Sequence, residues 1–158
     1  MTPSRPLQKA WGAALLAAAV LLLAACNSEP ATGPVPITYG RDGCDLCGMI
    51  ISDPRFATEI RGGPGHKAYK FDDMGDALHC LERETWKADA DVEIWVMDSD
   101  AGKTWLDARK AFFIDGMQSP MAHGFGAVAD QRPGAVPFDE MKSKLLSRRA
   151  SNFCATKT

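Results

Sequence analysis

Residues 44 to 49, with the sequence CDLCGM, combine side chains that bind soft metal ions. The segment holds two thiols and one thioether. Such sulfur ligands favour monovalent copper, whereas zinc and iron–sulfur sites need further thiolates or imidazoles. Side chains two positions apart in an extended strand point to the same face, so we expect Cys47 and Met49 to project together, with Gly48 between them. We therefore predict a Cu(I) site built on Cys47 and Met49, with Cys44 as a further candidate ligand.

The same cysteine pair permits other interpretations. Cys44 and Cys47 could form a disulfide, either structural or redox-active. A thioredoxin-like catalyst needs its cysteine pair at the start of a helix, which lowers a thiol pKa, but the β-branched Ile50 and Ile51 follow here. A zinc ribbon needs a second Cys-x-x-Cys pair, which the sequence lacks. A thiol–disulfide redox protein using Cys44 and Cys47 is therefore the main alternative, and spacing leaves open how the four cysteines after Cys26 pair.

A second segment with soft donors is GMQSPMAHG, at residues 116 to 124. It carries two thioethers and an imidazole in a loop-like setting, and histidine is a common metal ligand. Met121 and His123 are candidate ligands, and Met117 is a weaker one. If the two halves of the domain pack side by side, this loop would face the cysteine loop and complete a site with three or four ligands. The alternative is an ordinary turn, with Met121 in the core and His123 at the surface.

The remaining polar residues carry no recognisable catalytic arrangement. There is no nucleophile–base pair, no glycine-rich phosphate loop and no pair of general acids, so an enzyme is disfavoured. Asp72 and Asp73 are interpreted as helix caps. The net charge of the chain is −2, and no basic stripe marks a nucleic-acid interface. Nucleic acid is therefore not an expected partner.

The N-terminus has the pattern of a bacterial lipoprotein signal peptide. Two basic residues precede an uncharged apolar run at residues 13 to 25, which is shorter than the roughly 20 residues of a membrane-spanning helix. The run ends in LLAAC, which is similar to a lipobox. We predict a signal peptide at residues 1–25 and lipidation of Cys26. Asn27, by resemblance to other Gram-negative lipoproteins, favours anchoring on the periplasmic side of the outer membrane.

The composition after the signal peptide changes from a linker to a folded domain. Residues 26 to 38 include the lipidated cysteine and a stretch rich in Pro, Ser, Thr and Gly, which is typical of a flexible tether. Residues 39 to 152 form one domain of ordinary size. Without the signal peptide, 16 basic residues stand against 20 acidic ones, a net charge of −4. A mildly acidic surface suits a protein that carries a cation.

Periodicity and turn residues predict an α+β fold. FDDM at residues 71–74 recurs as FDEM at residues 138–141, each before an amphipathic segment. We therefore expect two similar ββαβ units packed together, at about 39–98 and 99–150, each with one helix and a small antiparallel or mixed sheet. The predicted strands lie at residues 49–52, 56–61, 66–71, 92–97, 104–106, 111–114 and 124–129, and the predicted helices at residues 72–83 and 138–149.

These motifs, taken in order, resemble those of the NosL family, copper-binding lipoproteins associated with the maturation of nitrous oxide reductase. The resemblance rests on the lipobox, the Cys-Gly-Met at residues 47–49, the FDD at residues 71–73, and the SPM at residues 119–121 followed by Gly124 and Phe125. It covers essentially the whole predicted domain.

The resemblance implies a Cu(I) chaperone that supplies copper for the copper–sulfide centre of nitrous oxide reductase. Implied partners are the reductase and a membrane ABC-type maturation complex, and the implied fold is a pair of ββαβ units that resembles part of organomercurial lyase. The implied ligands are Cys47 and Met49, with Met121 or His123 in the second motif, where Ala122 and His123 depart from the family's glycine-rich form. An enzyme like organomercurial lyase would need an acid beside the cysteine pair, and the spacing marks none.

Overall fold

A computed structural model describes residues 30 to 148 of the chain. The predicted signal peptide, Cys26 and the last residues of the predicted domain, 149 to 152, lie outside this range. Within it, no helix has the length and apolar character needed to cross a membrane. The elements are 3-10 helices at Pro54–Phe56 and Pro64–His66, strands β1 (Thr58–Gly62), β2 (Lys67–Phe71), β3 (Glu93–Met97), β4 (Trp105–Asp107), β5 (Phe112–Asp115), β6 (Phe125–Val128) and β7 (Ala135–Pro137), and helices α2 (Met74–Leu81) and α3 (Phe138–Ser147).

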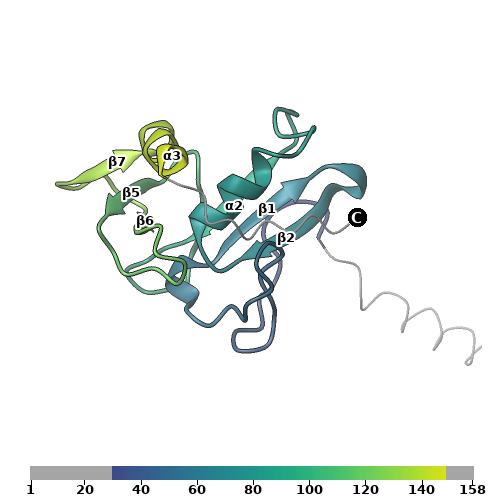
Figure 1. The fold of residues 1–158 in the computed structure, drawn as a ribbon, viewed down its shortest axis with the longest axis horizontal. Coiled ribbons are helices and arrows are strands. Elements are labelled where there is room, and N and C mark those ends of the chain that lie inside the picture. The colour runs from purple at the N-terminus through teal and green to yellow at the C-terminus, as the bar shows by residue number, and fades with distance from the viewer. Residues whose placement is uncertain (1–29, 149–158) are drawn as a thin grey trace, which may run out of the picture. The chain divides into compact units, whose positions relative to one another are not determined.

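The predicted α+β fold class is confirmed, since two antiparallel sheets each carry one helix (Figure 1). The first sheet has the strand order β2-β1-β3-β4, and the second has the order β6-β5-β7. The first follows the expected ββαβ order along the chain and then adds β4. In the second, the third strand β7 comes before helix α3 instead of after it. A parallel bridge between Asp98 and Ala127 connects the two sheets.

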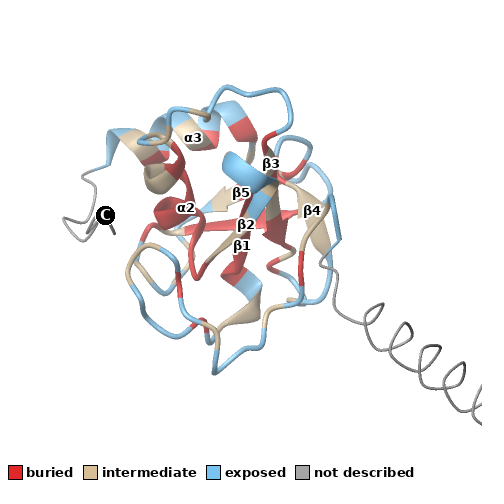
Figure 2. Cartoon of the chain, turned by 90° about the vertical axis from the view of Figure 1, so that its right-hand side faces the viewer, coloured by how far each residue is buried: buried red, intermediate tan, exposed pale blue. Residues whose placement is uncertain are grey.

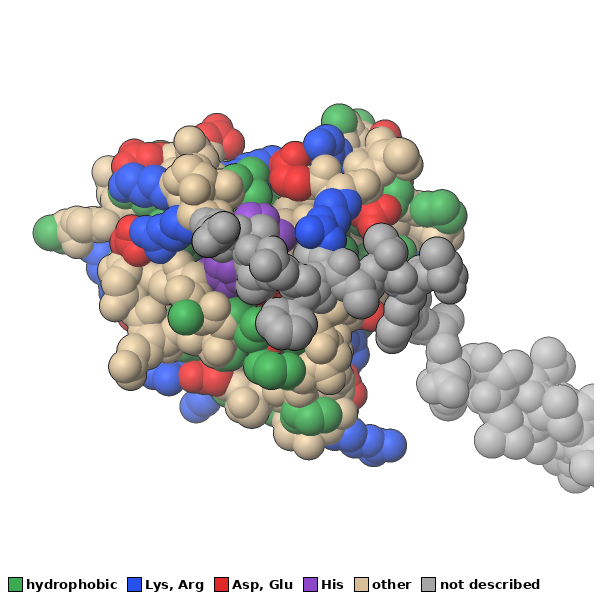
Figure 3. Space-filling model, in the orientation of Figure 1, with side chains coloured by type: hydrophobic (Ala, Val, Ile, Leu, Met, Phe, Trp, Pro, Cys, Tyr) green, Lys and Arg blue, Asp and Glu red, His purple; other side chains and the backbone are tan. Residues whose placement is uncertain are grey.

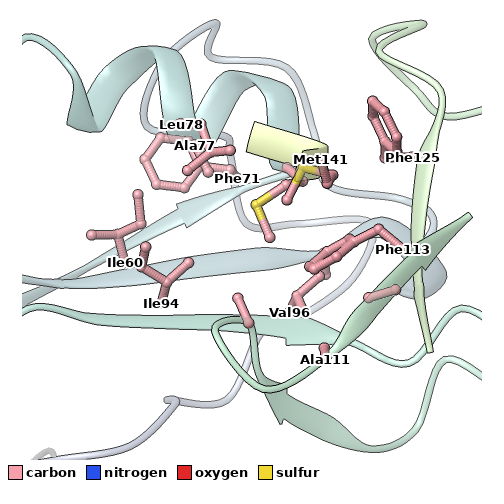
Figure 4. Packing of buried hydrophobic residues seen from close by; sticks show 14 of the residues in the cluster. Ile60, Phe71, Ala77, Leu78, Ile94, Val96, Ala111, Phe113, Phe125 and Met141 are labelled. Carbon is pink, nitrogen blue, oxygen red and sulfur yellow. The ribbon is translucent and has the colours of Figure 1, made fainter. Parts of the chain in front are cut away.

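Helix α2 buries the face that its periodicity predicts. Its apolar side chains at positions 74, 77, 78 and 81 are all at most 3% exposed. They belong to the same buried cluster as Ile60 and Ile94 of the first sheet and Phe113 of the second (Figure 4). Met141 and Leu145 of α3 complete that cluster. A single core therefore holds both units together, and buried segments run through α2 and the central strands in Figure 2.

The two helices begin differently despite their similar sequences. Asp73 is the N-cap of α2, and its carboxylate accepts a hydrogen bond of 2.8 Å from the backbone N–H of Gly75. This confirms an aspartate cap at the predicted place. Helix α3 begins after Pro137 without a side-chain cap. Met74 is therefore the first residue of its helix, whereas Met141 is the fourth residue of α3.

Residues 33 to 37, whose composition predicted a flexible tether, are bonded to the first sheet. The backbone N–H of Val35 donates to the buried carboxylate of Glu59 at 2.8 Å, and that of Gly33 donates to Glu93 at 2.7 Å. The Val35 side chain is only 7% exposed. All buried apolar side chains of the described part lie between Val35 and Leu145. Residues 27–158 therefore contain this whole core and suit the experiments below.

Candidate metal site

The cysteine loop is a closed turn. A bridge between Gly43 and Ile50 joins its ends. Inside it, the N–H of Cys44 donates to the carbonyl of Met49 at 2.8 Å, and the N–H of Gly48 donates to the carbonyl of Cys44 at 2.9 Å. Gly48 has φ +76°, a left-handed conformation that glycine adopts without the steric cost of a side chain. The chain therefore reverses direction at the position where we expected an extended strand.

The prediction of a strand at residues 49–52, with Cys47 and Met49 on one face, is thus wrong. Ile50 makes only the isolated bridge. The turn instead separates the sulfurs by depth: Cys44 is 3% exposed, Cys47 is half-buried and Met49 is 48% exposed. The loop therefore offers one sulfur to the interior, one at the boundary and one to solvent.

Two aspartates complete a cluster around the cysteine thiols. The Sγ atoms of Cys44 and Cys47 and one carboxylate oxygen each of Asp72 and Asp76 lie within 4.8 Å of one another. We refer to these four residues as the tetrad. The Sγ of Cys44 lies 3.8 Å from Oδ2 of Asp76. Four side chains that bind metals therefore meet where the cysteine loop packs against the start of α2.

Both thiols of the tetrad favour the protonated form. Burial raises the pKa of Cys44 and, less strongly, that of Cys47, and the carboxylate of Asp72 adds to both effects. Both are free cysteines. A thiol–disulfide catalyst instead needs a thiol with a lowered pKa, so this environment disfavours the redox alternative. A bound metal ion would have to displace the thiol protons, as in other thiolate sites.

Asp72 is the most unusual member of the tetrad. It is 1% exposed, and neither of its carboxylate oxygens has a hydrogen-bond partner of normal geometry. Burial raises its pKa, an effect that the facing Cys44 thiol partly offsets and that the charge of Asp76 increases. Its interpretation as a helix cap does not hold, because Asp73 takes that role.

The loop at residues 116–124 lies against the start of α2. The backbone N–H of Met121 donates to the carboxylate of Asp73 at 3.3 Å. Burial raises the pKa of Asp73, while a hydrogen bond with Ser119 opposes that rise. The half-buried Met121 is therefore held near α2, and through α2 this loop approaches the tetrad.

His123 is a buried partner of the tetrad, and not the surface residue of the alternative interpretation. It is 6% exposed, and its Nε2 lies 3.2 Å from Oδ1 of Asp76. This hydrogen bond raises the pKa of His123 despite its burial. The imidazole packs directly over Gly75, where a Cβ atom would lie 2.0 Å from Cγ of the ring. His123 is thus placed to orient Asp76, with that ring nitrogen already committed to the carboxylate.

Met117, the weaker candidate, and two other side chains able to bind metals, His79 and Cys80, lie outside the tetrad. The sulfur of Met117 packs over Gly126 of β6, where a Cβ atom would lie 2.2 Å away. The Met117 sulfur therefore lies close against the backbone of that strand. The His79 ring lies 5.6 Å from the His123 ring, and burial lowers its pKa. Burial raises the pKa of Cys80 to about 11.

Sequence reasoning missed Asp72 and Asp76 as members of the site. A spacing of four residues across the start of a helix places two side chains on one face, and this spacing was the available signal. The two aspartates also supply the acid that an organomercurial-lyase-like enzyme would require. Met49, on the same loop as the two thiols, is exposed, whereas a site that breaks a covalent bond gains from excluding water.

Fold and site together define a small α+β protein with a thiol–carboxylate cluster able to hold a metal ion. No protein-family profile matches the chain, and no curated protein is significantly similar to it. Among solved structures, its fold is similar to that of the copper chaperone NosL from Shewanella denitrificans, with a TM-score of 0.52 and 18% sequence identity. The match covers 75% of this chain and 89% of that chain. The likeness to NosL expected from the motifs is thus found in the fold.

Proposed function

We propose that this protein binds Cu(I) through the cysteine loop and transfers it to an acceptor protein. The observation that carries the proposal is the placement of two neighbouring thiols, Cys44 and Cys47, beside the exposed thioether of Met49 on one short turn. Soft sulfur ligands of this kind select Cu(I). The fold likeness to a copper chaperone supports the same class of cargo.

The gradient of exposure along the loop suits transfer by ligand exchange. Met49 and the half-buried Cys47 would hold the ion at the surface, where a sulfur or imidazole of the acceptor can approach it. Tyr39, Met49 and Ile50 are the large exposed hydrophobic side chains of the described part. The face drawn in Figure 3 has acidic, basic and apolar side chains interspersed. The ion changes ligands and keeps its oxidation state, so no substrate is chemically altered.

The second loop plays a supporting part in this proposal. His123 orients Asp76 behind the thiols, at 3.2 Å. Met121, held by its backbone bond to Asp73, is a further thioether that can join the copper during transfer. The copper ligands we propose are therefore Cys47 and Met49 first, with Cys44 behind them and Met121 as an accessory ligand.

We extend the proposal to the cellular setting on the strength of the sequence motifs. The protein is exported, lipidated at Cys26 and anchored on the periplasmic side of the outer membrane. Its acceptors are nitrous oxide reductase, which needs copper for its copper–sulfide centre, and the membrane ABC-type complex of that maturation pathway. The lipobox and the order of the NosL-like motifs support this setting.

An anaerobic Cu(I) titration of reduced residues 27–158 against a chromophoric chelator tests the copper site. Met49→Leu removes the thioether sulfur while keeping a similar volume, and Cys47→Ser removes the boundary thiol. Ile50→Leu is the matched control, because Ile50 is 50% exposed on the same loop and carries no donor atom.

We expect one copper ion per chain, bound at least about tenfold more weakly in both ligand variants, a loss of about 1.4 kcal/mol or more. The Ile50→Leu protein should bind as the unaltered protein does. Equal affinity in all four proteins would exclude the cysteine loop as the copper site.

A further inference from the structure

The outer edge of the first sheet carries the cysteine loop. Strand β2 is the outer strand of that sheet, and the backbone of Lys70 is paired there with Asp45, which stands between the two cysteines of the loop. The N–H of Asp45 donates to the carbonyl of Lys70 at 2.8 Å, and the N–H of Lys70 donates to the Asp45 carboxylate at 2.7 Å. Such partners satisfy the backbone groups that an edge strand leaves unpaired. The loop that holds Cys44 and Cys47 is therefore docked on β2 at Lys70.

The side chain of Lys70 adds a second attachment. Its Nζ donates to the carboxylate of Asp42, immediately before the loop, at 2.7 Å, and to the carbonyl of Pro36 at 2.8 Å. The Asp42 carboxylate also accepts a hydrogen bond of 3.0 Å from the N–H of Thr38. The hydrogen bond from Lys70 lowers the pKa of Asp42, so this carboxylate is ionised at neutral pH. A charge-assisted pair therefore fastens the entrance of the loop to β2.

Residues 33 to 38, which we call the strap, lie on the face of the sheet to which the Lys70 side chain points. Glu59 and Lys70 are register partners in β1 and β2, so their side chains share one face. On that face Glu59 accepts the N–H of Val35, and Lys70 donates to the carbonyl of Pro36. In sequence the strap joins the predicted lipid anchor to the cysteine loop. Lys70 is thus bonded both to the strap and to the loop that follows it.

We infer that Lys70 is the positioning residue of the copper loop, since it holds the loop against β2 and so keeps Cys44 buried and Cys47 at the boundary. It is bonded to Asp42 and Asp45, which flank Cys44 on both sides, and so acts on the ligands through the loop backbone. A loop that is already ordered loses less conformational entropy when it binds an ion. Without the Lys70 side chain, copper binding should weaken although every ligand is present. The inference rests on the proposed copper function for the ion, whereas closure of the loop is a property of the metal-free protein.

Alkylation by iodoacetamide, mapped by mass spectrometry on reduced, metal-free residues 27–158, measures how often the loop opens. Cys44 is 3% exposed, so it reacts when the loop leaves its place. Cys80 on α2 lies outside the loop and serves as the internal reference. Lys70→Met removes the ammonium group and keeps an unbranched side chain. Lys110→Met is the matched control, because it removes an ion pair with Asp107 at 2.9 Å outside the loop and the strap.

We expect Cys44 to be alkylated about tenfold faster in Lys70→Met than in the unaltered protein, because the variant loses a charge-assisted hydrogen bond. Cys80 should react at the same rate in both, and Lys110→Met should leave the rate at Cys44 unchanged. Lys70→Arg should restore slow alkylation, because a guanidinium also bonds to a carboxylate. An unchanged rate at Cys44 in Lys70→Met would overturn the inference. So would equal acceleration at Cys44 and Cys80, because Lys70 would then stabilise the whole fold and not the loop.

Competition for Cu(I) with a chromophoric chelator, run on the same proteins, tests the effect on copper. Lys70→Met should bind Cu(I) about three- to tenfold more weakly, Lys70→Arg should lose less, and Lys110→Met should bind as the unaltered protein does. Faster alkylation in Lys70→Met with unchanged copper affinity would overturn the positioning role. The two proposals fail separately: an unaltered protein that binds no copper refutes the copper function, whereas the alkylation rates involve no copper.

Discussion

Replacing Gly75 with alanine tests the contact that seats His123 behind the tetrad. Gly75 is the second residue of α2, and a Cβ atom there would lie 2.0 Å from Cγ and 2.2 Å from Cδ2 of the His123 ring. These separations are far below van der Waals contact. The imidazole must therefore leave its place, and its hydrogen bond to Asp76 at 3.2 Å is broken.

The expected magnitude combines three effects. Overpacking a tight site costs about 1–3 kcal/mol, and losing a hydrogen bond between charged groups costs about 1.5–3 kcal/mol. Alanine in place of glycine within a helix returns about 1 kcal/mol through helix propensity. Gly75→Ala should therefore destabilise the fold by about 1.5–5 kcal/mol. At roughly 4 °C per kcal/mol for a domain of this size, Tm should fall by about 6–20 °C.

Thermal and urea unfolding of residues 27–158, monitored by circular dichroism, measures this loss. Gly43→Ala is the matched control in the neighbouring loop, because a Cβ there meets carbonyl oxygens only at 3.7 and 3.8 Å. Its stability should change by less than about 0.5 kcal/mol. A double-mutant cycle sharpens the test: in a His123→Ala background the ring is absent, and Gly75→Ala should then stabilise by about 1 kcal/mol.

The result that would refute this reasoning is a Gly75→Ala protein as stable as the unaltered one or more stable. Helix propensity would then be acting alone, and His123 would not pack over α2. The ring resonances of His123 in NMR spectra give an independent reading. They should shift strongly in Gly75→Ala and stay in place in Gly43→Ala.

Three further predictions concern the same region. Ala122 has φ +59°, a left-handed conformation that costs energy for a residue with a side chain, so Ala122→Gly should stabilise the fold by about 1 kcal/mol. Ala101→Gly is the control at an exposed site without positive φ, and it should destabilise the fold slightly. Urea unfolding measures both changes. The hydrogen bond with Asp76 raises the pKa of His123 in the folded state. The stability that this bond contributes is therefore fully present below the unfolded pKa of about 6.5 and is lost as pH rises through the folded pKa. Unfolding experiments at several pH values should show that His123→Gln lowers the free energy of unfolding by an amount that shrinks as pH rises. Burial raises the pKa of Asp72, so its carboxylate destabilises the metal-free fold increasingly as pH rises above about 4. Asp72→Asn should stabilise that fold at neutral pH by about 1–3 kcal/mol. An unchanged or lower Tm of the variant would contradict this prediction.

Local patterns in the sequence were enough to predict the main elements of the fold. The apolar spacing of α2, the alternation of β1 and β2 and the strand-forming residues of β3 and β5 each led to an element within a few residues of its observed place. Strand β7 was missed because Pro137 removes a backbone donor, which argues against a strand from sequence. In the structure β7 is an edge strand, where proline is tolerated.

The candidate site was only partly predictable, because half of it depends on tertiary contacts. Cys44 and Cys47 are close in sequence, and their joint role was visible from spacing. Their depth was not, because it follows from the left-handed conformation of Gly48, which reverses the chain before Met49. Asp72 was assigned to capping, since nothing local distinguishes a cap from a carboxylate that the fold later buries beside a thiol.

The burial of Asp72 therefore separates a structural explanation of the site from a functional one. A fold selected for stability alone gains nothing from a carboxylate that is 1% exposed and lacks a hydrogen-bond partner, since such a group costs stability. Asparagine of nearly the same shape would avoid the cost of a buried charge. A cation bound beside the carboxylate would neutralise it and remove that cost. A gain in metal-free stability together with a loss of metal binding in Asp72→Asn is the combination that a metal site predicts and a purely structural role does not.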